Sequence, residues 1–374
     1  MATSSYPPYL GGVEEHVRNV ARVLRARGHD VVVWTIDRSG GFGVREVDGI
    51  EVWDLPAPLP ARSAAAMLRF AWRAPRAVAR WRRAHRAFRP DVVHVHCFGP
   101  NGTYARLLAA RTGTPMIVTS HGETLADDHG VFTHSRFAQD SLRRSLAVAA
   151  AVTGCSEVVL DDLVARFGLA RDRGVVVPNG IDLDEGEPAE VPGIRAPYVA
   201  AVGRTETVKG FDLLLEAFLA AELPGTSLVI AGDGDRLASL RESAAASDAA
   251  DRILFPGRLD RAQVAGLMAG ATAVVVPSRF EAFGIAVLES WRAHTPVVAT
   301  THGGPPEFVT DDVDGLLCDP LDRPALASAL ERLAGDAALR EKLADAASVR
   351  VRSFTWEHVV DRYAEVYASC ADSA

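Results

Sequence analysis

The chain has few cysteines and no long hydrophobic run. Its 374 residues include 4 cysteines, and no two of them form a CxxC pair. This scatter is typical of reduced thiols rather than of a disulfide framework. No apolar run approaches the roughly 18 residues that a membrane-spanning helix needs, and no secretory signal peptide is visible. These absences predict a cytoplasmic protein.

An excess of positive charge and a complete dinucleotide fingerprint are also missing. The formal net charge is -8, which argues against a nucleic-acid-binding protein. The stretch "AGDGDRLASL" places Gly232 and Gly234 after a strand but lacks the third glycine of a GxGxxG motif. His94 and His96 alternate onto one strand face, with no third metal ligand nearby in sequence. The sequence therefore favours packed histidines and no nucleic-acid partner.

The sequence does contain short β-branched runs that alternate with longer helical patterns. The strand candidates extend from "HDVVVWTI" near the N-terminus to "GLLCD" near the C-terminus. Most are continuous apolar runs, as expected of parallel strands that are buried on both faces. The first candidate, in "MATSSYPPYLGG", reaches its turn sooner than the usual length of about five or six residues allows. The alternation predicts doubly wound α/β sheets.

A change of composition divides the chain. Residues 183–196 are rich in acidic residues, proline and glycine and have little periodicity, which is typical of a linker. We therefore predict an N-terminal domain over residues 1–182 and a C-terminal domain over 197–353. Each would be Rossmann-like, and the two would face a cleft. Ligands of such sheets bind beyond the C-terminal ends of the strands.

Glycine-rich and basic turns follow two of these strands. Gly11 and Gly12 precede an amphipathic helix, where backbone amides and the helix dipole attract an anion; a tight turn is the simpler interpretation. Arg204 and Lys209 flank another turn into a helix. Both side chains can converge on one diphosphate, although exposed cations are common on any surface.

The stretch "SRFEAFGIAVLESW" places two carboxylates around a glycine. Glu281 lies in the turn after a buried strand, and Glu289 lies in the second turn of the next helix. Gly284 frees the neighbouring amides to point at an anion. A carboxylate accepts two hydroxyl donors, as the vicinal hydroxyls of ribose provide. The spacing thus fits a nucleotide sugar, or simply two exposed glutamates.

Together these segments resemble the retaining GT-B glycosyltransferases of family 4. The matching segments occur in the family's order and include "GGVEEHV", "DVVHVH", "VTSHGE", "VPNGID", "GRTETVKGFDLLLEAF", "FPGRL", "PSRFEAFGIAVLES" and "TPVVATTHGGPPEFV". The resemblance implies transfer of a sugar from a nucleotide-diphosphate donor to an acceptor hydroxyl. A UDP-sugar is the favoured donor and GDP-mannose the next. It also implies that the last helix, about residues 354–374, packs back on the N-terminal domain.

The resemblance assigns a role to each matching residue. The expected catalytic group is His121, Arg204, Lys209 and Glu281. The expected donor-binding group is Gly11, Gly12, Gly203, Arg258, Phe283, Gly284, Ile285 and Glu289. Because the leaving diphosphate takes the acceptor's proton, no side-chain base is needed, and positioning and electrostatics carry the reaction. The resemblance implies no metal-binding motif, so we predict no metal and no cofactor. An epimerase and a non-catalytic nucleotide-sugar-binding relative are the alternatives.

Two features give opposite indications of the acceptor. Glu123, Asp127 and Asp128 follow His121 and would attract a small cationic amino sugar or aminocyclitol. Residues 62–90 are rich in arginine and contain no acid, and Pro75 is a plausible helix start there. A basic amphipathic helix can lie on anionic lipid, which would suggest a lipid-linked acceptor and a peripheral position at the inner membrane face. It can equally cover the sheet with a solvated arginine face.

Overall fold

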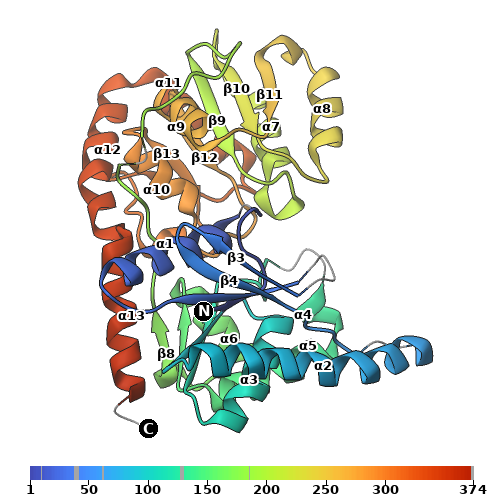
Figure 1. Cartoon of the computed structure of the whole chain (residues 1–374). Coiled ribbons are helices and arrows are strands. Elements are labelled where there is room, and N and C mark those ends of the chain that lie inside the picture. The colour runs from blue at the N-terminus through green and yellow to red at the C-terminus, as the bar shows by residue number, and fades with distance from the viewer. Residues whose placement is uncertain (10, 38–41, 61–62, 127–129, 185, 372–374) are drawn as a thin grey trace. The chain divides into compact units, whose positions relative to one another are not determined.

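The structure is a computed structural model that describes residues 1–9, 11–37, 42–60, 63–126, 130–184 and 186–371 (Figure 1). The chain forms two compact units. Unit 1 comprises Met1–Asn179 and Trp356–Ala374, and unit 2 comprises Gly180–Thr355. Each unit contains one sheet with helices on it.

Unit 1 contains an eight-stranded sheet in the order β3-β4-β2-β1-β5-β6-β7-β8. All neighbouring strands are parallel except β3 and β4, which are antiparallel. The strand order reverses at β1, which pairs with both β2 and β5. The strands are β1 (Ala2–Thr3), β2 (Val32–Ile36), β3 (Gly43–Val47), β4 (Ile50–Leu55), β5 (Val93–His96), β6 (Met116–Ser120), β7 (Ala151–Gly154) and β8 (Gly174–Val176).

The hairpin of β3 and β4 was not among the predicted strands. Its turn consists of Asp48 and Gly49, and both have a positive φ, of 52° and 74°. Such a two-residue turn matches the twist of the flanking strands, and Asp-Gly is one of its preferred sequences. The first strand, β1, is as short as the sequence indicates. The amino group of Met1 donates to Val32 O at 2.7 Å, and burial lowers its pKa to about 5.

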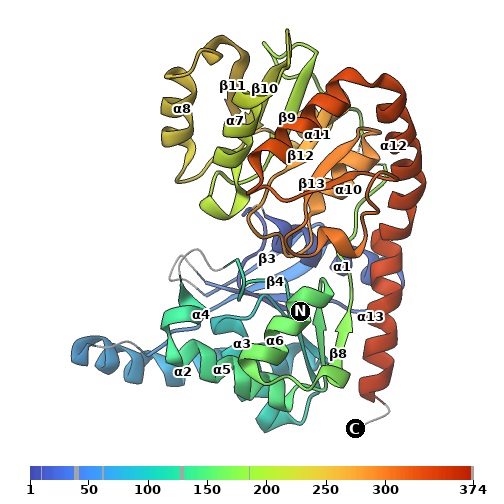
Figure 2. The ribbon, with the colours of Figure 1, turned by 180° about the vertical axis from the view of Figure 1, so that it is seen from behind.

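Helices cover both faces of the unit 1 sheet. Trp81 from α2, Tyr104 from α3, Leu142 from α5 and Leu160 from α6 share one core. Figure 2 labels these four helices. On the other face, α1 packs against α13. The helices are α1 (Gly12–Ala26), α2 (Ala64–Phe88), α3 (Pro100–Thr112), α4 (Val131–His134), α5 (Arg136–Val148), α6 (Glu157–Phe167) and α13 (Trp356–Ala371).

Helix α2 begins earlier than the sequence predicts. Ser63 is its N-cap and accepts a hydrogen bond from Ala66 N at 3.3 Å, so Pro75 lies inside the helix rather than at its start. The prediction of a start at Pro75 is therefore wrong. A serine cap satisfies an amide that the first turn leaves free. Pro75 is exposed, so the carbonyl that loses its helical partner there can bind water.

Unit 2 contains a six-stranded parallel sheet in the order β11-β10-β9-β12-β13-β14. This order reverses between β9 and β12, as in doubly wound nucleotide-binding folds. The strands are β9 (Tyr198–Val202), β10 (Ser227–Ala231), β11 (Ile253–Gly257), β12 (Ala273–Val276), β13 (Val297–Thr300) and β14 (Leu316–Cys318). The helices are α7 (Phe211–Ala220), α8 (Leu237–Ala245), α9 (Arg261–Ala269), α10 (Ile285–Arg292), α11 (Arg323–Gly335) and α12 (Ala337–Arg350).

The segment expected as a linker, residues 183–196, belongs to unit 2 where the structure describes it. Ala189 N donates to Ala262 O at 2.8 Å, and Val191 is buried in a core with Tyr198 and Leu267. The segment therefore lies against its own unit along part of its length. Within the described ranges, no helix is both long enough and apolar enough to span a bilayer.

Candidate active site

Two charged residues meet where the strand order of unit 2 reverses. Lys209 follows β9, Glu281 follows β12, and these strands are parallel neighbours. Lys209 Nζ lies 2.7 Å from Glu281 Oε2, and the side chains are 25% and 12% exposed. The carboxyl ends of strands at such a reversal are where ligands of open α/β sheets bind. The sequence predicted both residues as catalytic but did not indicate that they form an ion pair.

Glu281 is held by groups that the sequence analysis did not single out. Ser278 Oγ donates to Glu281 Oε2 at 2.8 Å. The loop after β13 packs on the backbone, where Glu281 N donates to His302 O and Gly304 N donates to Glu281 O. Gly303 has a φ of 113°, and a Cβ there would lie 2.0 Å from Glu281 O. The signal was the Gly-Gly pair in "THGGPPEF", which permits this close approach.

The turn after Glu281 leads directly into α10. Gly284 has a φ of 101°, in the left-handed region, and it is the N-cap of the helix. The side chain of Phe283 is buried and stacks on Phe308 at 4.7 Å between ring centroids. Only its amide can therefore serve a ligand. Val287 N donates to Gly284 O at 2.9 Å, which leaves the amides of Ile285 and Ala286 at the helix start to bind an anion.

In the basic loop after β9, the two cations predicted to share a diphosphate have different carboxylate partners. Arg204 is 66% exposed and forms an ion pair with Glu206, whereas Lys209 pairs with Glu281. Gly232 permits the loop after β10 to approach the backbone of Gly203 closely. A Cβ at Gly232 would lie 1.8 Å from Gly203 O. The glycines of "AGDGD" therefore serve backbone packing, which agrees with setting aside a dinucleotide fingerprint.

Glu289 lies near a cation that sequence reasoning missed. Burial lowers the pKa of Arg261, and the nearby carboxylate of Glu289 opposes this effect. Arg261 opens α9, directly after the loop that contains the exposed Arg258. The signal was the second arginine of "GRLDR". Glu289 is partly buried, and its charge favours the charged form of Arg261.

In unit 1, the ends of β5 and β6 bring together several histidines. His96 Nδ1 lies 3.3 Å from His121 Nε2, and the rings of His16 and His121 lie 4.7 Å apart. His16 Nδ1 bonds to Asn179 Oδ1 at 2.8 Å, and its Nε2 bonds to the Tyr363 hydroxyl at 2.9 Å. Burial lowers the pKa of His16 to about 4 and holds the pKa values of His96 and His121 well below the usual value. The cluster is therefore neutral near pH 7.

Three of these histidines have the composition of a metal site. Ligand atoms of His16, His96 and His121 lie within 4.8 Å of one another, the only such group of three found among the described residues. However, both nitrogens of His16 already have protein partners. His94 bonds to Thr119 Oγ1 and to the Tyr367 hydroxyl. These bonds favour a hydrogen-bonded network, in line with the predicted packing role of His94 and His96.

Glu123, predicted on the acceptor side, binds its own loop. Its Oε1 accepts from Phe98 N at 2.6 Å, and its Oε2 accepts from His121 N at 2.7 Å and Ser120 Oγ at 3.0 Å. These three bonds leave this carboxylate little capacity to bind an acceptor. Asp127 and Asp128, the other two predicted acceptor residues, lie outside the described residues.

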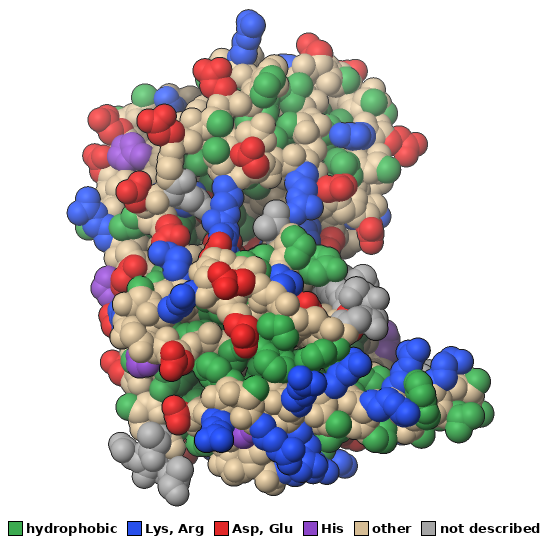
Figure 3. Space-filling model, viewed as in Figure 1, with side chains coloured by type: hydrophobic (Ala, Val, Ile, Leu, Met, Phe, Trp, Pro, Cys, Tyr) green, Lys and Arg blue, Asp and Glu red, His purple; other side chains and the backbone are tan. Residues whose placement is uncertain are grey.

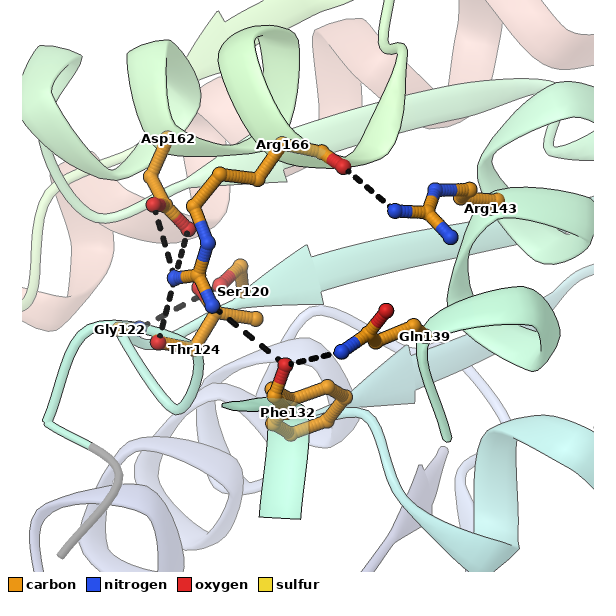
Figure 4. A network of polar contacts seen from close by, with 8 residues as sticks. All are labelled: Ser120, Gly122, Thr124, Phe132, Gln139, Arg143, Asp162 and Arg166. Carbon is orange, nitrogen blue, oxygen red and sulfur yellow. Dashed lines mark hydrogen bonds and ion pairs between the residues drawn. The ribbon is translucent and has the colours of Figure 1, made fainter. Parts of the chain in front are cut away.

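The loop after β6 is fixed at both ends by one side chain. Arg166 Nη1 donates to Thr124 O at 2.9 Å and to Asp162 Oδ1 at 3.0 Å, and its Nη2 donates to Phe132 O at 3.5 Å (Figure 4). Gln139 also donates to Phe132 O. Arg166 therefore connects α6 to the residues on either side of the segment that contains Asp127 and Asp128.

The glycines at the start of α1 are exposed. Gly12 is the first residue of the helix and Gly11 is its N-cap. Gly11 has a φ of 174°, which is extended backbone, so this position does not require the positive φ that the simpler interpretation invoked. A Cβ at Gly11 would lie 2.6 Å from a carboxylate oxygen of Glu14. The carboxylate of Glu14 therefore lies against the start of the helix.

Comparison with known proteins agrees with this geometry. Residues 10–185 match Glycosyltransferase Family 4, and residues 190–350 match Glycosyl transferases group 1. A glycogen synthase of Mycobacterium tuberculosis is 31% identical over 98% of this chain and 93% of the relative. A D-inositol 3-phosphate glycosyltransferase of Mycolicibacterium smegmatis is 31% identical (96% and 86%). An alpha-D-kanosaminyltransferase of Streptomyces kanamyceticus is 28% identical (74% and 76%).

Solved structures show the same fold. A sucrose-phosphate synthase of Thermosynechococcus elongatus has a TM-score of 0.82 at 23% identity, with 100% of this chain and 96% of that chain covered. Anabaena Alr3699/HepE in complex with UDP and glucose has a TM-score of 0.77 at 20% identity, with 98% of each chain covered. With the two parallel sheets and the residues at their strand ends, these matches show that the chain belongs to the GT-B nucleotide-sugar glycosyltransferases of family 4, glycosyl transferases group 1.

Proposed function

We propose that the protein is a retaining glycosyltransferase that transfers a hexosyl group from a nucleotide-diphosphate sugar to an acceptor hydroxyl. The observation that carries the proposal is the Lys209–Glu281 pair at the strand-order reversal of unit 2. A UDP-sugar is the first choice of donor and GDP-mannose the second. The solved structure of the same fold that holds UDP and glucose supports this order.

Each residue near this reversal has a proposed role. Lys209 and Arg204 stabilise the diphosphate as it leaves, and the start of α10 donates amides to it. Glu281 contacts the transferred sugar, while Glu289 binds the ribose hydroxyls. The departing diphosphate takes the acceptor proton on the face from which it leaves. This course retains the anomeric configuration and needs neither a side-chain base nor a metal.

A titration of donors tests the proposal. Calorimetry with UDP, GDP and their sugars should identify one base that binds the wild type. With the matching nucleotide sugar and no acceptor, slow release of free sugar should follow, and NMR should show that the product of transfer keeps the donor's anomeric configuration. Binding without any hydrolysis or transfer would instead support the non-catalytic alternative.

For the acceptor, we propose a small cationic amino sugar or aminocyclitol. The likeness to an alpha-D-kanosaminyltransferase supports this class. The charges would come from Asp127 and Asp128, next to the loop end that Arg166 holds. Replacing both aspartates by Asn should raise the acceptor KM about tenfold, since a charged hydrogen bond contributes about 1.5–3 kcal/mol. Unchanged KM for an aminocyclitol acceptor would contradict this assignment.

The outer face of α2 favours a second candidate, a membrane-surface enzyme with a lipid-linked acceptor. Leu68 and Trp72 are 74% and 61% exposed, and the Arg76 guanidinium lies 4.0 Å from the Trp72 ring centroid. Figure 3 shows basic and hydrophobic side chains gathered along this helix at the lower right. Such a face can enter the interface of an anionic bilayer. Sedimentation with phosphatidylglycerol vesicles, comparing wild type with Leu68→Ser and Trp72→Ser, separates this candidate from the first.

A further inference from the structure

A pocket opens between α2, α3 and α5 of unit 1, and its lining includes none of the residues assigned to catalysis. Its volume is about 290 Å³. This is near the lower end of the roughly 300–1,000 Å³ of typical small-ligand sites. The lining is mostly apolar, with Leu59, Phe70, Val78, Leu107 and Phe137 among its members. A ligand here would bury a short hydrocarbon part.

Several polar groups of this pocket have partners within the protein. Thr103 Oγ1 bonds to Ser141 Oγ at 2.8 Å, and the Tyr104 hydroxyl donates to Pro58 O at 2.9 Å. Asp140 forms an ion pair with Arg143 at 3.3 Å. The charged groups that remain in the lining are two arginines, Arg106 and Arg144.

Neither of these arginines forms an ion pair with a described residue. Arg106 lies on α3 and Arg144 on α5, and neither has a hydrogen-bond or ion-pair partner in that part of the chain. The Nε of Arg106 is buried without an acceptor. The pKa of Arg106 is lowered, first by burial and then by the positive charge of Arg144. Two guanidiniums that repel each other beside an apolar pocket are unfavourable without an anion.

We propose that this pocket binds an amphipathic anion, with a phosphate or carboxylate between Arg106 and Arg144 and a short apolar group between α2 and α3. The guanidinium fork matches the oxygens of both anions. The ligand would satisfy the buried Nε and remove the repulsion between the two cations. The ligand is either a membrane lipid or a free metabolite, because both can combine an anionic group with an apolar group. The site does not depend on the proposed sugar transfer.

Calorimetry on the full-length protein without any sugar donor tests the site. Octyl phosphate, used below its micelle concentration, should bind the wild type. Octyl glucoside has the octyl group without the negative charge, and inorganic phosphate has the negative charge without the octyl group. Both should therefore bind at least tenfold more weakly than octyl phosphate. Arg106→Gln and Arg144→Gln should each raise the Kd for octyl phosphate at least tenfold. Ala74→Phe, which keeps both charges and narrows the pocket, should do the same.

The controls separate a lost site from a lost fold. Arg195→Gln removes one exposed positive charge from unit 2 and should bind octyl phosphate as the wild type does. Nucleotide binding should stay unchanged in the pocket variants, and the thermal unfolding midpoint of the two arginine variants should not fall, because each substitution removes the repulsion between the two cations. Equal binding of octyl glucoside, or wild-type binding by Arg106→Gln, would overturn the proposal. If the wild type sediments with phosphatidylglycerol but not with phosphatidylcholine vesicles, and the arginine variants do not, the natural ligand is a lipid. If the wild type does not sediment with phosphatidylglycerol vesicles, the ligand is a free anion.

Discussion

Lys209 Nζ and Glu281 Oε2 lie 2.7 Å apart, although the two residues are 72 positions apart in the chain. The pair joins the loop after β9 to the loop after β12, across the reversal of strand order. The sequence assigned Lys209 to the leaving diphosphate and Glu281 to the sugar. Because each side chain fixes the position of the other, these two roles are coupled.

Lys209→Ala and Glu281→Ala should each lower kcat by about two to three orders of magnitude, as loss of a transition-state stabiliser does. The double variant should lose little more than the worse single variant, because each substitution already breaks the shared pair. Steady-state kinetics on the wild type, the two single variants and the double variant measures the coupling energy between the two residues. Multiplicative losses would show that the ion pair has no part in turnover.

Glu289→Ala should weaken nucleotide binding about tenfold or more while kcat changes less, because Glu289 is assigned to the ribose hydroxyls. Glu281→Ala should show the opposite pattern. Titration calorimetry with the nucleoside diphosphate checks both, and Glu341→Ala, at an exposed position of α12, is the control. If Glu289→Ala binds the nucleotide as the wild type does, the ribose assignment is wrong.

Arg166→Gln should raise the acceptor KM about tenfold and leave the donor Kd unchanged. The substitution removes bonds to Thr124 O and Phe132 O on either side of the acceptor loop (Figure 4). Arg166 is a positioning residue, so Arg166→Lys should recover part of the loss. Arg171→Gln, which breaks only exposed ion pairs of α6, is the matched control. Equal losses of donor and acceptor binding would indicate general misfolding.

Acidification should destabilise unit 1 between pH 6.5 and about 4. The pKa of His16 is lowered from 6.5 to about 4 by burial, so the unfolded chain binds the proton more readily than the folded one. The contribution of neutral His16 to the free energy of unfolding is complete above pH 6.5. It is lost as the pH falls toward 4, and the loss is about 3 kcal/mol. Urea unfolding at pH 7.5 and 5.0 should show a smaller difference in His16→Gln than in the wild type.

Activity should survive EDTA, since charge at the diphosphate is assigned to Lys209, Arg204 and the start of α10. The three-histidine group of unit 1 gives this test a specific alternative. Activity lost in EDTA and restored by zinc in the wild type, but not in His96→Ala, would place a metal there. Activity restored by manganese would place it at the diphosphate.

The sequence alone determined the fold class and the local setting of most site residues. Apolar β-branched runs and glycines at helix starts act over a few residues, so they could be read without the tertiary structure. The β3–β4 hairpin was missed although Asp48-Gly49 was a usable signal. The start of α2 was misplaced because Pro75 was given more weight than the capping serine, Ser63.

Only the tertiary structure decided which distant residues meet. Lys209 reaches Glu281 because β9 and β12 are neighbours, and His16 reaches Tyr363 because α13 packs on α1. Arg106 and Arg144 face one pocket because α3 and α5 lie side by side. Strand order and helix packing arise from the sum of contacts over the whole core, whereas periodicity records only which face of an element is buried. For that reason the sequence determined the separate parts of each site, and the fold alone determined their pairing.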